Sequence, residues 1–331
     1  MFTSEPISTP GSRDLERSSM VRASRLYYLE GKGQAEIARI LKVSRPSVSR
    51  LLTRARLEGI VEIRVRGSED GTDWAAVARG IGLSELVVAA SESLSAEETK
   101  AAVGQAGADW FALHVQPGEA VGLTAGTTLS AFTRHVRHGL GLGLKIVPLV
   151  GTLWDTGQDF DGSFLCQELR RRVGGTHLVL SAPAVVGSTA LARSLRAEPR
   201  VRGVLELFST LEHVFLGIGN AEEDHPIVIA AKRSALGTDE NRRILPRQAV
   251  ASVGCLFFDS QGKPCRTALD GRTIGIRHDD LMAIPVRVGL GCGKDKLAAS
   301  LALVRGGVVN VLVVDEALAH GLRRSSKDPG R

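Results

Sequence analysis

The side chains best suited to chemistry include the hydroxyl and guanidinium groups of residues 44–54. Val48, Leu51, Leu52 and Ala55 recur at the spacing of one helix face. With that apolar stripe turned inward, the opposite face carries Arg45, Ser49, Arg50, Thr53 and Arg54. Such groups contact phosphates and base edges in the major groove of DNA. The segment therefore predicts a DNA-recognition helix.

Three glycine-containing turns could hold an anion: 122–128 (GLTAGTT), 217–220 (GIGN) and 289–296 (GLGCGKDK). In each, glycine lets the backbone approach a ligand, and free N–H groups where a helix follows would face it. The third turn adds lysines, but it is no Walker loop because no Ser or Thr follows a Gly-Lys pair. A single turn of this kind is routine in α/β folds for steric reasons. Three together favour a phosphorylated or polyhydroxyl ligand.

The elements that must position the DNA-facing side chains form a helix-turn-helix. A helix with Ile37, Ala38 and Leu41 inward precedes the recognition helix, and the few residues between them allow only a tight turn. Ser44 is a natural N-cap of the second helix, and Pro46 stands in its first turn, where a missing N–H costs little.

The flanking segments complete an N-terminal domain, expected over residues 19–66. Residues 1–18, rich in Ser, Pro and charge, are expected to form a flexible arm, and a first helix is expected at 19–30 with Leu26, Tyr27 and Leu29 available for packing. Residues 60–65 alternate mostly apolar with charged side chains, as a wing strand or the start of a linker would. The domain boundary is expected at 66–72.

Charge is concentrated in the same region. Residues 1–66 contain 13 Lys and Arg against 7 Asp and Glu, which leaves 29 of each sign in residues 67–331 from chain totals of 42 and 36. The formal net charge of +6 therefore belongs to the N-terminal fifth. A basic N-terminal domain on a body of balanced charge is expected if the N-terminal domain binds phosphate groups and the body binds a different partner.

Residues 67–322 alternate apolar runs with helical patterns. The expected strands are 86–90, 120–123, 145–149, 178–180, 213–218, 250–258, 285–288 and 308–314, with helices at 97–113, 128–138, 164–173 and 294–305. This alternation predicts a doubly wound α/β domain around a largely parallel sheet. Ligands of such domains bind beyond the carboxyl ends of the strands. The tail, 323–331, is expected to be disordered.

Composition excludes several classes of protein. The chain has 331 residues, 43% of them hydrophobic, and 37 glycines, which is a globular composition. No stretch approaches a membrane span, and the N-terminus lacks the apolar core of a signal peptide, so we expect a cytoplasmic protein without a membrane partner. The four cysteines have no metal-ligand spacing. We expect no cofactor, no metal and no catalytic residues.

From about Val21 to Leu322 the order of motifs resembles the SorC-type sugar-binding transcriptional regulators, which include central glycolytic gene and deoxyribonucleoside regulators. In the head the match covers Gln34, 37–38, 44–52, Ala55 and 59–61. In the body it covers 121–122 with 126–129, 148–151, 182–186, 217–219, 257–259, Gly293 with Lys296, and 310–316.

The resemblance implies a winged helix-turn-helix head followed by an effector-binding and oligomerisation domain similar in fold to sugar-phosphate isomerases. It implies a dimer or tetramer whose grip on double-stranded operator DNA is shifted by a sugar, typically phosphorylated, and hence control of a carbohydrate-catabolism operon. Carried over to this chain, the DNA-binding residues are Gln34, Ser44, Arg45, Pro46, Ser47, Ser49, Arg50 and Arg54. The effector-binding residues are Gly126, Thr127, Thr128, Gly151, Thr152, Ser252, Gly293 and Lys296.

The chain departs from the family pattern at three places. Ser252 stands where an acidic residue usually binds sugar hydroxyls, and 151–154 reads Gly-Thr-Leu-Trp where Gly-Gly-Leu is usual. Lys42 takes a turn position where glycine is common, and a left-handed backbone there would cost about 1 kcal/mol.

Two alternatives compete with a regulator. An isomerase or deaminase on the same fold would need a general base, for which Asp155, Asp259 and Asp315 are available, although Asp315 more naturally caps or buttresses a turn. A serine recombinase would carry its helix-turn-helix at the other end of the chain, beside a nucleophilic domain that we do not find. The regulator is the preferred hypothesis.

Overall fold

The computed structural model describes residues 12–57, 60–61, 71–91, 93–153, 161–222, 225–233 and 245–326. The chain divides into two compact units, Met1–Thr72 and Asp73–Arg331. Each unit is described by itself.

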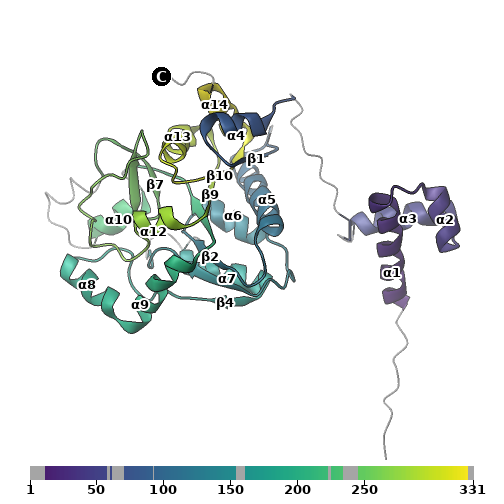
Figure 1. Cartoon of the computed structure of the whole chain (residues 1–331), viewed down its shortest axis with the longest axis horizontal. Helices are drawn as coiled ribbons and strands as arrows, with labels where there is room; N and C mark the ends of the chain where they lie inside the picture. Colours follow the sequence, from purple (N-terminus) through teal and green to yellow (C-terminus); the bar gives the residue numbers. More distant parts are fainter. Residues whose placement is uncertain are drawn as a thin grey trace, which may run out of the picture. The chain divides into compact units, whose positions relative to one another are not determined.

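The described part of the first unit contains four helical elements (Figure 1). They are α1 (Ser12–Ser24), a π-helical turn (Arg25–Leu29), α2 (Gln34–Leu41) and α3 (Arg45–Leu57). Ala23, Leu26, Ile37, Val48 and Leu52 form its buried core. Ala38, Leu41 and Leu51 pack against this core from half-buried positions, and Ala55 is fully buried. The predicted inward faces of both motif helices are therefore confirmed.

Lys42 does adopt the left-handed conformation, with φ 54° and ψ 42°. The backbone N–H of Lys42 bonds to Arg39 O at 3.3 Å, and that of Val43 bonds to Ala38 O at 3.0 Å. These bonds satisfy the last carbonyls of α2 and turn the chain sharply toward α3.

Two expectations for this unit were wrong. Residues 12–18, which were expected to belong to a flexible arm, are helical in α1, and the rest of the expected arm, 1–11, lies outside the described residues. Leu15, Glu16 and Arg17 are good helix formers, and Asp14 and Glu16 suit a helix N-terminus, which outweighs the polar composition of this stretch.

Tyr27 does not pack as expected, since it is 37% exposed, and Tyr28 packs against the core instead. The π-helical bond from Glu30 N–H to Arg25 O adds a residue to the turn, which rotates the following side chains relative to an α-helix. The expected wing strand falls mostly on 62–65, outside the described residues. Ile60 and Val61 instead donate their N–H groups to Ala55 O.

The second unit is built on a seven-stranded parallel sheet in the order β1-β10-β9-β5-β2-β3-β4. Its strands are β1 (Glu85–Ala89), β2 (Ala120–Leu123), β3 (Leu144–Pro148), β4 (Gly175–His177), β5 (His213–Gly217), β9 (Val286–Gly291) and β10 (Val311–Asp315). A smaller antiparallel sheet contains β6 (Gly219–Asn220), β7 (Ala249–Val253) and β8 (Leu256–Asp259).

The α-helices among the described residues of this unit are α4 (Trp74–Ile81), α5 (Ala96–His114), α6 (Thr127–His135), α7 (Gly162–Val173), α8 (Thr189–Ala197), α9 (Pro199–Glu206), α10 (Pro226–Arg233), α12 (His278–Ala283), α13 (Leu297–Arg305) and α14 (Glu316–Ser326). Short 3₁₀ turns lie at Leu207–Thr210 and Lys294–Lys296.

Helices cover both faces of the large sheet, as predicted for a doubly wound fold (Figure 1). Helices α5, α6 and α7 pack on side chains such as Phe215 and Val313. The other face, which includes Val214 and Leu312, packs against α4, α13 and α14. Because neighbours along each strand point to opposite faces and both faces are covered, the strands read as continuous apolar runs.

Some predicted elements differ from those observed. The run 250–258 is two strands, β7 and β8, joined by a turn at Gly254, whose φ is +54°. The edge strand β4 lies at 175–177, just before the predicted 178–180. The tail predicted to be disordered from Arg323 is helical through Ser326. The buried Leu322 anchors the last turns, and Ser325 and Ser326 donate to Gly321 O and Arg323 O.

Candidate DNA-binding and effector-binding sites

Helix α3 presents the predicted polar face. Val48, Leu52 and Ala55 are buried at i, i+4 and i+7, which directs the intervening positions outward. The side chains of Ser44, Arg45, Pro46, Ser49, Arg50 and Arg54 are exposed, and that of Ser47 is half-buried. Gln34 is half-buried in the first turn of α2.

The start of α3 is capped as the sequence predicts. The backbone N–H of Ser47 donates to Ser44 Oγ at 3.3 Å, and the two hydroxyl oxygens lie 2.8 Å apart. Arg50 donates from its guanidinium to Ser47 Oγ at 3.4 Å. The cap therefore also orients an arginine on the exposed face. Arg45 and Pro46 occupy the first turn. Because Pro46 has no N–H and the N–H of Ser47 is used in the cap, the group there that suits phosphate is the exposed Arg45 side chain.

The first predicted ligand loop lies at the carboxyl end of β2. Gly126 precedes α6 and has φ +142° and ψ 159°, a conformation essentially reserved for glycine. A Cβ placed there would meet no atom within 4 Å, so the space above it is open. Thr127 is exposed and Thr128 half-buried in the first turn of α6. The N–H groups of that turn have no partner within the helix, which suits an anion.

The glycine-containing turn at 289–296 includes the last residues of β9 and contacts the first turn of α6. Burial raises the pKa of the Cys292 thiol, and a hydrogen bond with the Thr128 side chain opposes that shift. Gly293 has φ +95°, and its N–H donates to Asp315 Oδ1 at 2.7 Å. Lys296 Nζ lies 3.5 Å from Asp295 Oδ2. The strand ends of β2, β9 and β10 are thereby joined around one edge of the sheet.

Gly151 and Thr152 lie beyond β3 in a tightly packed crossing of chain segments. A Cβ on Gly151 would lie 2.4 Å from Ala182 O, so only glycine fits there. Thr152 N–H donates to Ala182 O at 2.9 Å, and Thr152 O accepts from Ala184 N–H at 3.0 Å. The backbones of both residues are committed to this packing. The half-buried Thr152 side chain is the part that could reach a ligand. Trp154 lies outside the described residues.

Ser252 is fully buried in β7 and has a partner that sequence reasoning missed. Its Oγ lies 2.8 Å from His225 Nε2, and His225 Nδ1 accepts from Ile227 N–H at 3.2 Å. The acceptor at Nδ1 places the imidazole proton on Nε2, from which it is donated to Ser252. A Cβ on Gly219 would lie 2.2 Å from Ser252 Oγ. No spacing rule connects positions 225 and 252, so only the fold could reveal the pair.

Two of the three carboxylates considered as a general base accept hydrogen bonds from backbone N–H groups instead. Asp259 accepts from Gln261 N–H and Lys263 N–H, both at 2.9 Å, within its own turn. Asp315 is buried and accepts from Gly293 N–H and, at 3.3 Å, from Leu318 N–H. Asp315 therefore buttresses a turn, as the sequence suggested. Asp155 lies outside the described residues.

The four cysteines are free thiols. Burial raises the pKa of Cys166 well above its usual range and that of Cys255 to about 12. Thiols so reluctant to ionise are unreactive, which fits a packing role for these two. Within the described ranges, no cluster of three or more His, Cys, Asp or Glu could hold a metal ion. Among the same residues, no helix has the length and apolar character to cross a bilayer.

Comparison with known proteins agrees with this geometry. The family model "Putative sugar-binding domain" matches residues 75–322. A model described as "Sigma-70, region 4" matches residues 25–58, which contain the π-helical turn, α2 and α3. The chain belongs to the SorC-type family of sugar-binding transcriptional regulators.

The chain is similar over almost its full length to several regulators. It is 25% identical over 312 residues to the deoxyribonucleoside regulator of Bacillus subtilis, covering 93% of this chain and 98% of that protein. It is 24% identical over 305 residues to the sorbitol operon regulator of Klebsiella pneumoniae, covering 91% and 96%. The crystal structure of the full-length sorbitol operon regulator aligns with a TM-score of 0.73 at 24% identity, covering 96% of this chain and 100% of that one. This likeness shows a shared fold.

Proposed function

We propose that this protein is a DNA-binding regulator of a carbohydrate-catabolism operon, and that a phosphorylated sugar gates its grip on the operator. The observation that carries the proposal is the pairing of two features in one chain. Helix α3 exposes arginine and serine side chains in one unit, and the other unit matches a sugar-binding family over residues 75–322. A sugar-phosphate isomerase or deaminase would have no use for the first feature, and the relatives named above are regulators.

In the proposed DNA complex α3 lies in the major groove. Arg45, Ser49 and Arg50 reach base edges or phosphates, and the remaining contacts to the DNA backbone come from Gln34, Ser44, Pro46, Ser47 and Arg54. We infer a homo-oligomer, a dimer or a tetramer, because two identical heads would occupy successive half-sites. The operator should then be roughly palindromic. We infer that the DNA-binding and effector domains, expected at 19–66 and 67–322, correspond to the two compact units that divide between Thr72 and Asp73, and we place the protein in the cytoplasm.

In the proposed effector complex the phosphate lies at the start of α6. Gly126, Thr127 and Thr128 supply backbone N–H groups and hydroxyls, and Lys296 supplies a second cationic contact from the neighbouring loop. Gly293 shapes that loop. The Thr152 side chain lines the same edge beside Gly151. Because Ser252 is fully buried and bonded to His225, we infer that it shapes the site from behind.

The effector can shift DNA binding only through different affinities for two arrangements of the heads.

The test is binding of the purified full-length protein to DNA flanking its own gene, with and without a panel of free and phosphorylated sugars. Salt must be held fixed, because phosphate contacts make affinity fall steeply with ionic strength. We expect a specific complex whose affinity changes with one sugar phosphate and not with its unphosphorylated form. Absence of any specific complex, together with turnover of a sugar phosphate, would instead identify an enzyme.

A further inference from the structure

The side chain of Lys100 has a position on α5 that its own helix does not explain. It lies in the second turn, with 24% of the side chain exposed, and its Nζ is 2.8 Å from Oε1 of Glu97, which is 84% exposed. Cations stabilise the C-terminal ends of helices, and Lys100 stands near the opposite end. An ion pair with so exposed a carboxylate contributes little to stability. The role of Lys100 therefore depends on the elements that pack beside α5.

Helix α5 packs backbone to backbone against α6 (Figure 1). A Cβ on Gly104 would lie 2.6 Å from the carbonyl carbon of Ala131, so only glycine allows the two helices to approach this closely. Each helix follows a strand of the parallel sheet, so both begin at its carboxyl edge and run in the same direction. One turn back from this contact, α5 carries Lys100 and α6 carries Thr127. The crossing therefore places Lys100 beside the first turn of α6.

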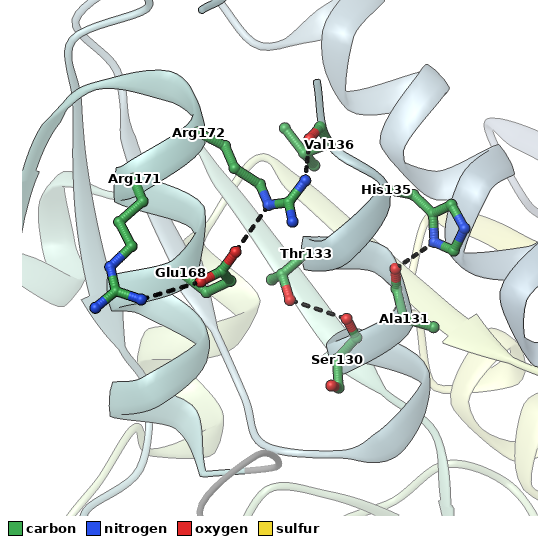
Figure 2. Close-up of polar contacts among 8 residues, drawn as sticks. All are labelled: Ser130, Ala131, Thr133, His135, Val136, Glu168, Arg171 and Arg172. Atoms are coloured by element: carbon green, nitrogen blue, oxygen red, sulfur yellow. Dashed lines mark hydrogen bonds and ion pairs between the residues drawn. The ribbon is translucent and has the colours of Figure 1, made fainter. Parts of the chain in front are cut away.

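The opposite end of α6 is anchored to α7 (Figure 2). Arg172 of α7 donates from Nη1 to Val136 O at 2.9 Å and from Nε to Glu168 Oε1 at 3.0 Å. Just beyond α6, Gly139 N–H donates to Arg172 O at 2.9 Å. Because α5 packs along one flank of α6 and α7 holds its C-terminal end, the first turn of α6 is fixed relative to Lys100.

The turn after β9 brings Cys292 to the same place. Helix α5 lies over this strand, since a Cβ on Gly107 would lie 2.8 Å from Leu290 Cδ2. A little further along the chain, burial raises the pKa of the Cys292 thiol. A hydrogen bond with the Thr128 side chain and the positive charge of Lys100 both oppose that rise. Lys100 therefore lies within electrostatic range of a thiol that contacts the start of α6.

The carboxylates of the surrounding described segments already have partners. Three of them accept hydrogen bonds from backbone N–H groups, namely Asp315, Glu316 and Glu98. Asp295, which is 64% exposed, lies 3.5 Å from the half-buried Lys296, much as the exposed Glu97 pairs with Lys100. An anion that reaches both lysines therefore displaces exposed carboxylates and leaves no buried charge unpaired.

We propose that Lys100 is a phosphate-binding residue of the effector site and forms, with Lys296, the pair of cations that selects a phosphomonoester over a neutral sugar. The inference rests on the effector site proposed above at the start of α6. A phosphomonoester carries a charge of about −1.5 to −2 near pH 7. The N-terminus of α6 supplies about +0.5 and Lys296 one further charge, so Lys100 completes the balance. A neutral sugar gains nothing from either lysine and leaves both ion pairs in place.

The test measures binding of inorganic phosphate to the full-length protein by isothermal titration calorimetry, in chloride buffer at constant ionic strength. K100M removes the charge and keeps the length of the side chain, and K100R keeps the charge. E97Q removes the exposed partner of Lys100 and leaves the lysine free for phosphate. The matched control is K145M, which removes an exposed lysine near the start of β3, toward the amino edge of the sheet.

K100M should weaken phosphate binding by about tenfold or more, because a hydrogen bond between charged groups is lost. K100R should retain most of the affinity, and K145M should match the wild type. E97Q should bind phosphate at least as tightly as the wild type, because the ammonium group no longer has a competing partner. If the ion pair only stabilised α5, K100M and E97Q would weaken binding equally, and that result would overturn the proposal.

Thermal melting of every variant checks folding, and K100Q replaces K100M if the methionine variant melts early. Gly126→Ala, which distorts the start of α6, separates this inference from the proposed function. Weaker binding in Gly126→Ala together with wild-type affinity in K100M would leave the phosphate site standing and overturn the role of Lys100. Absence of saturable phosphate binding in the wild type would overturn both.

Discussion

The hydroxyl of Thr124 accepts a hydrogen bond from the backbone N–H of Gly217 at 3.0 Å, across 93 residues of sequence. In return, the N–H of Thr124 donates to Phe215 O at 3.1 Å. These bonds join the carboxyl ends of β2 and β5, which are neighbours in the sheet. From this pair the strand order continues through β3 and β4 on one side and through β9 and β10 on the other. Such a switch point is where open α/β sheets bind ligands. The buried Thr124 therefore holds the floor of the proposed effector site.

Thr124→Val should destabilise the protein by about 1–3 kcal/mol, because it leaves the Gly217 N–H without its acceptor. Urea unfolding measures this loss. Thr124→Ser keeps the hydroxyl and should recover most of the stability. Wild-type stability in the valine variant would show that the bond does not tie the two strands.

The variants Gly126→Ala and Gly151→Ala should impair different properties of the protein. At Gly126 there is space for a Cβ but the backbone is strained for any other residue, which costs about 1–3 kcal/mol and distorts the start of α6. At Gly151 the Cβ would overlap Ala182 O, which forces the backbone apart. We expect Gly126→Ala to weaken effector binding beyond its effect on melting. Gly151→Ala should mainly lower the melting temperature. The reverse pattern would contradict the proposed phosphate position.

Asp315→Asn should loosen the loop after β9. One oxygen remains as acceptor, but the amide NH₂ then faces either Gly293 N–H or Leu318 N–H, and bonds to a charged acceptor contribute about 1.5–3 kcal/mol. Faster amide hydrogen exchange at Gly293, together with lower stability, is the expected result. The exposed Asp280→Asn serves as control and should change stability by less than about 0.5 kcal/mol.

Arg50→Ala should weaken operator binding by about 1–3 kcal/mol, roughly tenfold or more, with little change in melting temperature. Arg50 is exposed on α3, so its removal leaves the core of the head intact. Arg22→Ala, at an exposed position of α1, is the matched control. Equal affinity for the operator in Arg50→Ala and wild type would refute the assignment of α3 as the recognition helix.

Stability should fall as the pH drops below about 6.5 because of His213. Burial lowers the pKa of His213 from its ordinary 6.5, although Glu119, 3.0 Å away, opposes the shift. A histidine with a lowered folded pKa binds fewer protons than in the unfolded chain. Its contribution is complete above 6.5 and is lost as the pH falls toward the folded pKa.

Unfolding free energies measured between pH 5 and pH 7.5 test this dependence on His213. His213→Gln should flatten the slope in that window, whereas His138→Gln, at an exposed position, should not. An unchanged slope in His213→Gln would assign the acid sensitivity to other groups.

Local signals were enough to predict the two motif helices of the head. The spacing of Ile37, Val48 and Leu52 identified the inward faces, and the Ser44 cap marked where α3 begins. Both depend on residues a few positions apart, which is the range over which helix geometry acts. The π-helical turn at 25–29 escaped because its sequence is compatible with an α-helix.

The effector domain shows where sequence reasoning stops. Apolar alternation predicted the sheet, but the run 250–258 concealed a hairpin, because Gly254 alone interrupts it. The Ser252–His225 bond and the Thr124–Gly217 bond join residues 27 and 93 positions apart. No periodicity spans such separations.

The sequence by itself determined the class of each unit, the exposed polar face of α3 and the glycine turns at the strand ends, because these follow from short-range backbone and burial preferences. Only the tertiary structure decided which turns meet. Strand order brings the ends of β2, β5, β9 and β10 to one edge and places the end of α6 beside Arg172 of α7. Strand pairing is a long-range choice, made by the packing of two apolar faces at once, and no local segment encodes it.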